Sequence, residues 1–204
     1  MNKNNVIGVV LSGGLSKRMG EDKSEKKING KSLIELVLKR SEEQVAKIII
    51  NSNKEKNLFL RLGYKNIIKD CIDGNLGPLV GILSGLKWVE KNSNNKWLVC
   101  FPVDSPFFPK NLVSKFLEES KDYEILMAKS LGRVHPVFSM WKVNSNMAIE
   151  LEKFLMNNQR KIDAFTKNFK TRVVNFPDIG YDPFFNVNTP DDLLKAETIY
   201  EKNI

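Results

Sequence analysis

Residues 6–23 read VIGVVLSGGLSKRMGEDK, and they join an apolar segment to a pair of glycines and then to two cationic side chains. Val6–Leu11 is short, apolar and rich in β-branched residues, which predicts a buried strand. The Gly13–Gly14 pair has no Cβ atoms, so the backbone of the following turn can approach a ligand closely. Arg18 and Lys23 supply positive charge beyond the turn. Backbone N–H groups together with cations suit a nucleoside triphosphate, so we expect a phosphate-binding turn here.

The spacing of these residues excludes two common nucleotide-binding motifs. Dinucleotide-binding folds use G-x-G-x-x-G, which the glycines at positions 13, 14 and 20 do not fit. A P-loop requires G-x-x-x-x-G-K-[ST], and no glycine immediately precedes Lys23. Taken alone, the stretch is also compatible with an ordinary glycine turn carrying two solvated basic residues, because short glycine motifs have many false positives.

The rest of the chain alternates apolar strand-like segments with amphipathic helical ones. This pattern predicts a single α/β domain, residues 1–204, with a doubly wound, mostly parallel sheet and helices on both faces. The predicted strands are 6–11, 47–51, 66–69, 97–101, 124–128, 134–141 and 171–176, with 134–141 a candidate for an antiparallel strand. The predicted helices are 32–44, 78–91, 109–119 (opened by Pro109), 144–156, 161–169 and a last one capped by Thr189 and begun by Pro190.

Polar residues follow three of the predicted strands, namely Asn51, Asp70 and Asp104. A doubly wound fold binds its ligands at the carboxyl ends of the strands. Asp104 lies between Pro102 and Pro106, which stiffen the turn and aim the carboxylate. A single aimed carboxylate suits Mg²⁺, which takes one or two carboxylates plus substrate phosphates, although an Asp can also cap its own turn. Asn51 and Asp70 are equally compatible with contacts to a base or ribose and with ordinary turn roles.

The composition indicates which class of molecule the protein binds and where in the cell it is located. The net charge of +8 suits acidic partners, but the lysines are scattered and no basic run with interleaved aromatics occurs, so we expect phosphorylated small molecules rather than nucleic acid. No apolar run is long enough to span a bilayer, and the first five residues lack the apolar core of a signal peptide. We therefore expect a cytoplasmic protein without membrane contact. Cys71 and Cys100 are too few for a disulfide scaffold or a cysteine-rich metal site.

Five segments, in this order, resemble the molybdenum cofactor guanylyltransferase (MobA) family. They are 11–23 (LSGGLSKRMGEDK), 71–82 (CIDGNLGPLVGI), 101–107 (FPVDSPF), 135–138 (HPVF) and 185–193 (FNVNTPDDL). Many nucleotidyltransferases share the first segment, whereas the ordered set is far more specific. The resemblance covers Val6 to about Tyr200. It implies a nucleotide-diphospho-sugar-transferase-like Rossmann-type fold, with a nucleotide-binding half at about 1–110 and an acceptor-binding half at about 111–204.

The resemblance also implies roles for individual residues. The backbone of Leu11–Gly13 would hold a guanine base, Lys23 and Arg18 would offset phosphate charge, and Asp104 would bind Mg²⁺. The residues implied to contact the nucleotide are Leu11, Ser12, Gly13, Gly14, Lys23, Asn51, Asp70 and Asp104. Those implied to serve the acceptor are Asn186, Asn188 and His135.

Alternative roles remain open for the acceptor set. Asn186 fits an acceptor contact and Asn188 a polar contact near the metal, but both also fit loop residues that prepare the Thr189 cap. His135 is the only histidine. A structural or acceptor-contacting role suits it better than base catalysis, because a phosphate nucleophile is already ionised at neutral pH.

The activity implied by the resemblance is transfer of GMP from GTP to the molybdenum–molybdopterin cofactor, giving the guanine dinucleotide and pyrophosphate. The implied partners are GTP, this cofactor, other proteins of molybdenum cofactor biosynthesis, and molybdoenzymes. Two alternatives stay open: a cytidylyltransferase for the same cofactor or another phosphorylated acceptor, and a non-catalytic carrier of nucleotide or cofactor. Ser12 and Val80 stand where alanine is more usual in the family. Asp22 precedes Lys23 where cytidylyltransferases of the methylerythritol phosphate type usually have proline, which argues against that type.

Overall fold

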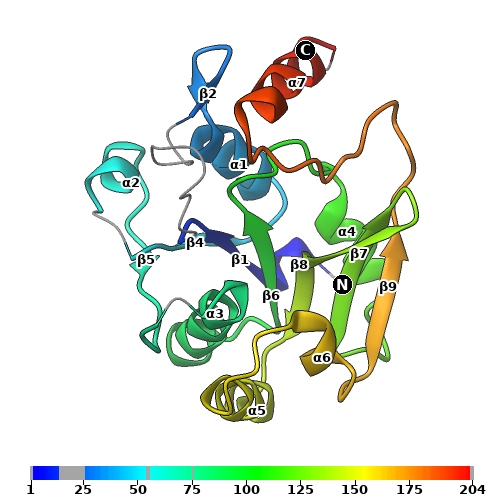
Figure 1. Ribbon diagram of the computed structural model, residues 1–204. Helices are drawn as coiled ribbons and strands as arrows, with labels where there is room; N and C mark the ends of the chain where they lie inside the picture. Colours follow the sequence, from blue (N-terminus) through cyan, green and yellow to red (C-terminus); the bar gives the residue numbers. More distant parts are fainter. Residues whose placement is uncertain (1, 14–25, 54–55, 75, 203–204) are drawn as a thin grey trace.

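The computed structural model describes residues 2–13, 26–53, 56–74 and 76–202. Its main element is a seven-stranded sheet of order β5-β4-β1-β6-β8-β7-β9 (Figure 1). The strands are β1 (Val6–Leu11), β4 (Lys47–Asn51), β5 (Ile67–Ile68), β6 (Trp97–Pro102), β7 (Ile125–Ser130), β8 (Arg133–Lys142) and β9 (Thr171–Asn175). β8 pairs antiparallel with both β6 and β7, and the other pairings in this sheet are parallel. The predicted mostly parallel sheet and the antiparallel direction of its 134–141 segment are therefore confirmed.

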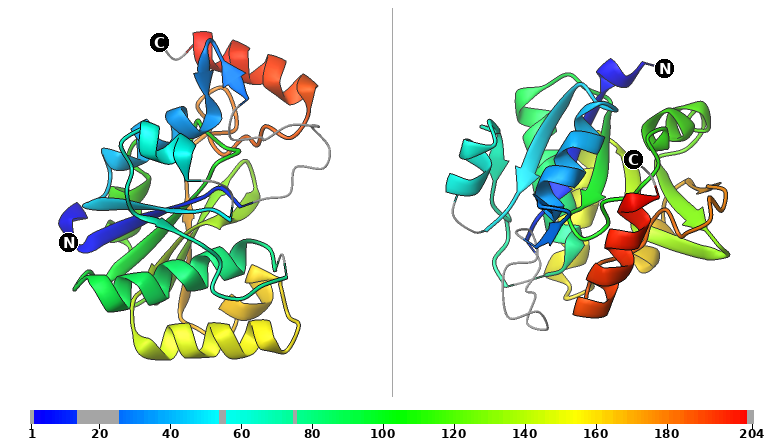
Figure 2. Two further views of the ribbon diagram at one scale, coloured as in Figure 1. Left: turned by 90° about the vertical axis from the view of Figure 1, so that its left-hand side faces the viewer. Right: turned by 90° about the horizontal axis from the view of Figure 1, so that it is seen from above.

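Helices cover both faces of this sheet, as predicted (Figures 1 and 2). On one face lie α1 (Leu33–Glu42), the short α2 (Asn57–Arg61) and α4 (Leu112–Glu118). On the other lie α3 (Pro78–Asn92), α5 (Ser145–Met156) and α6 (Ile162–Thr166). Each face has its own apolar cluster, because strand side chains point alternately to opposite sides. None of the helices in the described part of the chain is long and apolar enough to cross a membrane.

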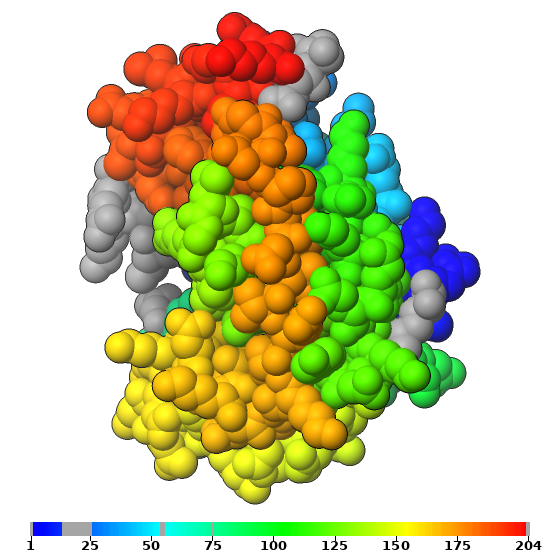
Figure 3. Space-filling view, turned by 90° about the vertical axis from the view of Figure 1, so that its right-hand side faces the viewer, coloured from blue at the N-terminus to red at the C-terminus, as the bar shows by residue number. Residues whose placement is uncertain are grey.

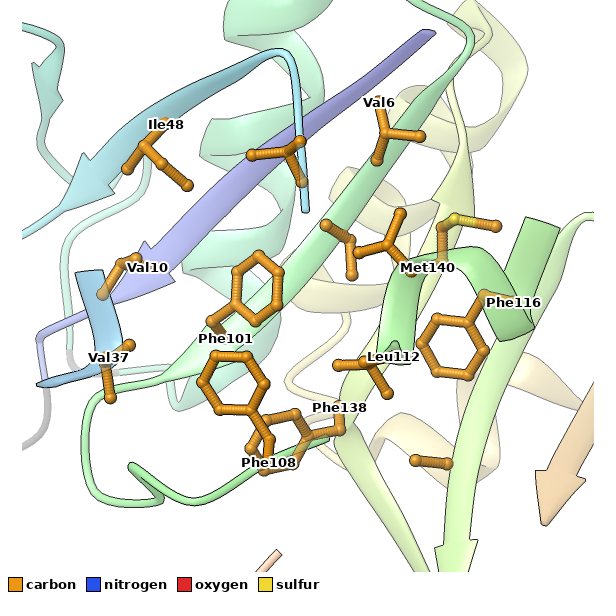
Figure 4. Packing of buried hydrophobic residues seen from close by; sticks show 14 of the residues in the cluster. Val6, Val10, Val37, Ile48, Phe101, Phe108, Leu112, Phe116, Phe138 and Met140 are labelled. Atoms are coloured by element: carbon orange, nitrogen blue, oxygen red, sulfur yellow. The ribbon is translucent and has the colours of Figure 1, made fainter. Parts of the chain in front are cut away.

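Aromatic side chains join β6 and β8 on the α1–α4 face (Figure 4). The ring centroids of Phe101 and Phe108 are 5.0 Å apart, and those of Phe108 and Phe138 are 5.6 Å apart. All three side chains are at most 2% exposed. This packing fixes the chain that leaves the carboxyl end of β6, and Asp104 lies within that segment.

The last helix, α7 (Pro190–Glu201), begins as predicted. The Thr189 hydroxyl accepts from the N–H of Asp192, and the Asp192 carboxylate accepts from the N–H of Thr189, which is a capping box. α7 packs beside a small hairpin that the sequence pattern did not predict, formed by β2 (Lys27–Ile28) and β3 (Lys31–Ser32). Together with Phe107 and Val187 they build a third apolar cluster.

Two predicted helices differ from the observed ones. Pro109 does not open α4; instead it accepts a main-chain hydrogen bond from the N–H of Leu112, the first residue of the helix. The prediction of a helix over 161–169 is too long, because α6 ends at Thr166 and the N–H groups of Asn168 and Phe169 bond back three residues in turns. Beyond α6 the chain enters β9, which crosses the face shown in Figure 3 between α4 and the tip of the β7–β8 hairpin.

Candidate active site

The carboxyl ends of β1 and β4 are joined at Ser12 and Asn51. The main-chain N–H of Ser12 donates to the carbonyl of Asn51 at 2.9 Å. Both residues are 3% exposed or less. The Ser12 hydroxyl is buried and has no hydrogen-bond partner among the described residues. The predicted base-holding segment, Leu11–Gly13, therefore lies against the predicted polar residue of β4.

Asp70 receives hydrogen bonds from two asparagines. The Asn51 amide Nδ2 donates to Oδ1 of Asp70 at 2.9 Å, and the Asn53 Nδ2 donates to Oδ2 at 2.7 Å. The main-chain N–H of Asp70 donates in return to the Asn53 Oδ1 at 2.9 Å. Asn53 thus holds Asp70 by two bonds, and Asp70 holds Asn51 by one.

Gly81, in the first turns of α3, leaves room for the Asn51 side chain. A Cβ atom at Gly81 would lie 2.4 Å from Oδ1 of Asn51 and 2.7 Å from Cδ2 of Leu11. A Cβ atom at Gly13 would lie 3.8 Å from the same Asn51 oxygen. Because real Cβ atoms do not approach oxygen as closely as 2.4 Å, only glycine fits at position 81 with Asn51 in this place.

Asp104 lies at the carboxyl end of β6, beside the end of β1. The N–H of Val103 donates to the carbonyl of Leu11 at 3.2 Å, and the Asp104 carbonyl accepts from the N–H of Val187 at 2.7 Å. The buried Ser105 hydroxyl is hydrogen bonded to Oδ1 of Asn186 and lies 3.4 Å from Oδ1 of Asp104. The segment that holds the predicted acceptor residue Asn186 is therefore fixed to the turn that holds Asp104.

Asn188 contributes its main chain to the start of α7. Its N–H donates to Oδ2 of Asp192 at 3.0 Å, alongside that of Thr189. This main-chain bond fits the alternative in which Asn188 prepares the helix cap, and the predicted polar contact of Asn188 near a metal stays a prediction. Asn186 instead contacts Ser105 and is exposed.

His135 belongs to a polar cluster at the tip of the β7–β8 hairpin. Its Nε2 lies 2.8 Å from the hydroxyl of Ser130, which donates its only proton to Oδ1 of Asp182 at 2.7 Å. The imidazole ring packs on Phe184 with 4.7 Å between ring centroids. Burial lowers the pKa of His135, Asp182 opposes this shift, and Arg133 adds to it. A neutral ring with its proton on Nε2 satisfies these contacts, because Nε2 must then donate to Ser130.

This cluster does not have the arrangement of a nucleophilic Ser–His–Asp triad. In such a triad the carboxylate orients the histidine and the histidine takes the serine proton. Here the Ser130 proton points to Asp182, and Oδ1 of Asp182 lies 3.8 Å from Nε2 of the ring. The cluster instead anchors the 182–184 segment, which continues to Asn186, onto β8.

The structure brings most of the predicted site residues to one edge of the sheet. Leu11, Ser12, Gly13, Asn51 and Asp70 form one group and Asp104 with Asn186 a second, and these groups are adjacent because β1 pairs with both β4 and β6. His135 lies in the separate hairpin cluster. Gly14, Arg18 and Lys23 lie outside the described residues. The sequence reasoning missed Asn53, Ser105, Ser130 and Asp182, although Asn53 follows Asn51 by two residues and this spacing was a usable signal.

The carboxyl edge of the sheet offers few carboxylates that could bind a metal ion. Within residues 2–13, 26–53, 56–74 and 76–202, no group of three or more His, Cys, Asp or Glu side chains is placed to hold a metal ion. A cation here would need ligands from its substrate as well. Mg²⁺ is bound in this way in many phosphate-handling sites.

Comparisons with known proteins identify relatives over nearly the whole chain. The family model "MobA-like NTP transferase domain" matches residues 8–171. A molybdenum cofactor guanylyltransferase of Rhodopseudomonas palustris (strain BisB5) is 38% identical and the match covers 94% of this chain and 92% of that protein. One of Rhizobium meliloti (strain 1021) is 36% identical, with 93% and 89% covered.

Solved structures extend the likeness to the fold. The crystal structure of molybdopterin-guanine dinucleotide biosynthesis protein A from Archaeoglobus fulgidus has a TM-score of 0.72 and 28% identity, and the match covers 96% of this chain and 99% of that one. The 4-diphosphocytidyl-2C-methyl-D-erythritol synthase from Anaerococcus prevotii has a TM-score of 0.75 over 98% and 97% of the two chains. At 12% identity, this second likeness concerns the fold alone.

Proposed function

Because this chain belongs to the family of MobA-like NTP transferases, we propose that it transfers GMP from GTP to the molybdenum–molybdopterin cofactor. The products are the guanine dinucleotide form of the cofactor and pyrophosphate. The names of the curated relatives support this activity. The main structural support for this activity is the hydrogen-bonded Asn51–Asp70 pair beside the end of β1, which lies on the same edge of the sheet as Asp104.

The reaction needs positioning and charge neutralisation more than proton transfer. A terminal phosphate oxygen of the cofactor forms a bond to the α-phosphorus of GTP, and the bond from that phosphorus to the β-phosphate bridging oxygen breaks. Phosphoryl transfer of this kind relies on in-line placement of the groups. The nucleophile is already ionised, so the neutral His135 is not required as a base.

Asp104 fits a magnesium ligand by its chemistry and its place. Its carboxylate is half-buried in a turn fixed by the Val187 and Ser105 contacts, at the edge where phosphates would lie. Asp104 would hold the ion together with oxygens of the bound nucleotide. A bound Mg²⁺ supplies charge stabilisation for the phosphate oxygens.

The remaining roles complete the proposal. Arg18 and Lys23 would neutralise charge that builds on the leaving pyrophosphate, as the family signature implies. Asn186 and His135 would line the acceptor side, with Asn188 near the metal. The first half of the chain, about 1–110, would then bind the nucleotide, and the second half, about 111–204, the cofactor.

Binding of single nucleotides tests the proposal first. We would measure thermal stabilisation by GTP, CTP, ATP and UTP, each with and without Mg²⁺. A nucleotide at about one hundred times its Kd stabilises a protein by about 2.7 kcal/mol, which is a clear shift. We expect the shift with GTP alone, enhanced by Mg²⁺. A shift with CTP alone would move the protein to a cytidylyltransferase, and no shift at all would favour a carrier of cofactor.

Product formation tests the second half of the proposal. Protein, GTP, Mg²⁺ and the molybdopterin cofactor should yield pyrophosphate and the guanine dinucleotide in equal amounts. A phosphate assay coupled to pyrophosphatase measures the first product, and mass spectrometry detects the second. GTP binding without product would contradict the transferase activity.

A further inference from the structure

The hydrogen-bond chain from Asn53 through Asp70 to Asn51 has a fixed direction. A carboxylate accepts hydrogen bonds and cannot donate them. Each asparagine therefore turns its NH₂ group toward Asp70, at 2.9 Å for Asn51 and 2.7 Å for Asn53. The carbonyl oxygen of Asn51 must then face away from Asp70.

The direction of that oxygen is set by Gly81 and Gly13. The Asn51 Oδ1 lies 2.4 Å from the place that a Gly81 Cβ would take and 3.8 Å from the place that a Gly13 Cβ would take. Among the described residues, the side chain of Asn51 makes its only hydrogen bond to Asp70. Oδ1 is therefore an acceptor available to a ligand between the end of β1 and the start of α3.

The surroundings of this oxygen fit a nucleobase rather than a phosphate. Asn51 is 3% exposed, and the walls beside its amide are Leu11 and two glycines without side chains. A phosphate would be repelled by a carbonyl oxygen and would lose its water in such a place. A flat, neutral ring that offers N–H donors fits both the shape and the polarity.

Guanine is the base that this arrangement prefers. Its Watson–Crick edge carries two adjacent donors, N1–H and the N2 amino group, that one carbonyl oxygen can accept together. Cytosine can offer that oxygen only its single amino group, and the acceptor N3 beside it would face the same oxygen and be repelled. If the Asn51 amide were flipped, its NH₂ group would face the base and would favour cytosine instead. The orientation of one amide therefore contributes to the choice between the two nucleotides.

We propose that Asn53 is a positioning residue for base selection, which acts through Asp70 to keep the carbonyl of Asn51 turned toward the base. Asn53 holds both the main-chain N–H and the Oδ2 of Asp70, so it fixes the carboxylate that orients Asn51. Asn53 itself is exposed, and within the described part of the chain its side-chain hydrogen bonds go to Asp70. This inference rests on the proposed function, because it presumes GTP as the nucleotide.

Asn53→Ala tests the inference through the ratio of two affinities. Without acceptor there is no transfer, so the Kd values for GTP and CTP can be measured by titration calorimetry with Mg²⁺. We expect Asn53→Ala to weaken GTP binding by about 10-fold, equivalent to about 1.4 kcal/mol, and to leave CTP binding within about 2-fold. The preference for GTP should fall by the same factor of about 10.

A matched control and a conservative variant sharpen the result. Asn94→Ala removes another exposed asparagine, at the opposite end of the sheet before β6, and should leave both affinities unchanged. Asn53→Asp places a second carboxylate beside Asp70 and should lower the GTP preference at least as much as alanine. Thermal unfolding should show that all three variants are folded.

The possible failures are distinguishable. Equal weakening of GTP and CTP by Asn53→Ala, or no change in either, would overturn the positioning role while leaving the proposed function intact. A wild-type protein that binds GTP no more tightly than CTP would overturn the proposed function itself.

Discussion

The hydroxyl of Ser105 is hydrogen bonded to the side-chain oxygen of Asn186, a residue 81 positions further along the chain. The neighbouring residues are also bonded: the carbonyl of Asp104, just before Ser105, accepts from the N–H of Val187, just after Asn186, at 2.7 Å. These two contacts attach the segment before α7 to the turn that follows β6. The predicted metal ligand and a predicted acceptor contact are thereby held in one unit.

Replacement of Ser105 should loosen this unit. Ser105 is fully buried, so Ser105→Ala leaves Asn186 without its partner and should lower the free energy of unfolding by about 1 kcal/mol. Urea unfolding measures the loss, with the exposed Ser114→Ala on α4 as the control. In kinetics, we expect Ser105→Ala to raise the KM for the cofactor and to leave the KM for GTP unchanged. Unchanged stability would show that the contact contributes nothing to the fold.

Loss of the Asp104 carboxylate should stop the reaction without unfolding the protein. Asp104→Ala removes the charge that we assign to Mg²⁺, and turnover should fall by about 100-fold or more. Pyrophosphate release measures the rate, and circular dichroism checks the fold. Asp122→Ala, at an exposed turn before β7, should retain full activity. If Asp104→Ala kept more than about a tenth of the activity, the metal assignment would be wrong.

His135 should make the stability of the protein depend on pH near neutrality. Burial lowers its pKa below the ordinary 6.5, so the unfolded chain binds more protons than the folded one just below that pH. The free energy of unfolding should then decrease as the pH falls through 6.5. His135→Asn removes this titration, and no other histidine replaces it. Denaturation between about pH 7.5 and 5.5 compares the two proteins; curves that run parallel would contradict the prediction.

Two glycines of α3 should respond differently to the same substitution. Gly81→Ala places a Cβ atom 2.4 Å from Oδ1 of Asn51, so GTP affinity should fall by about 10-fold, or about 1.4 kcal/mol. Gly85→Ala places one 2.9 Å from Cδ2 of Leu98 in the core, so it should change stability and leave GTP affinity within about 2-fold. Calorimetric titration and thermal unfolding separate the two effects. Equal losses of affinity would mean that Gly81 acts through the core as well.

The sequence predicts the sheet better than it predicts the contacts around the site. Short apolar runs mark β1, β4 and β6 to within one residue, because a buried strand must be apolar whatever its neighbours are. The start of α4 is predicted poorly, since proline suits both a helix start and the turn that Pro109 forms here.

The same distinction applies to the candidate site. Asn51, Asp70 and Asp104 could be predicted because each follows a recognisable strand. The partners of the polar side chains could not, because they are distant in the chain: Asn53 binds Asp70 across 17 residues, and Ser130 binds Asp182 across 52. Although Asn53 follows Asn51 by two residues, no local pattern identifies Asp70 as its partner before the fold brings the two together.

The cluster of α7 with the β2–β3 hairpin bears on how the protein matures during synthesis. Ile28 and Leu33 are completely buried, and α7, with Ala196, is among the elements that cover them. A chain that leaves the ribosome from its N-terminus presents these two side chains to water until α7 has emerged. A nascent or prematurely ended chain that lacks the 12 residues of α7 would therefore expose an apolar surface at the β2–β3 hairpin, where proteases and chaperones can recognise it.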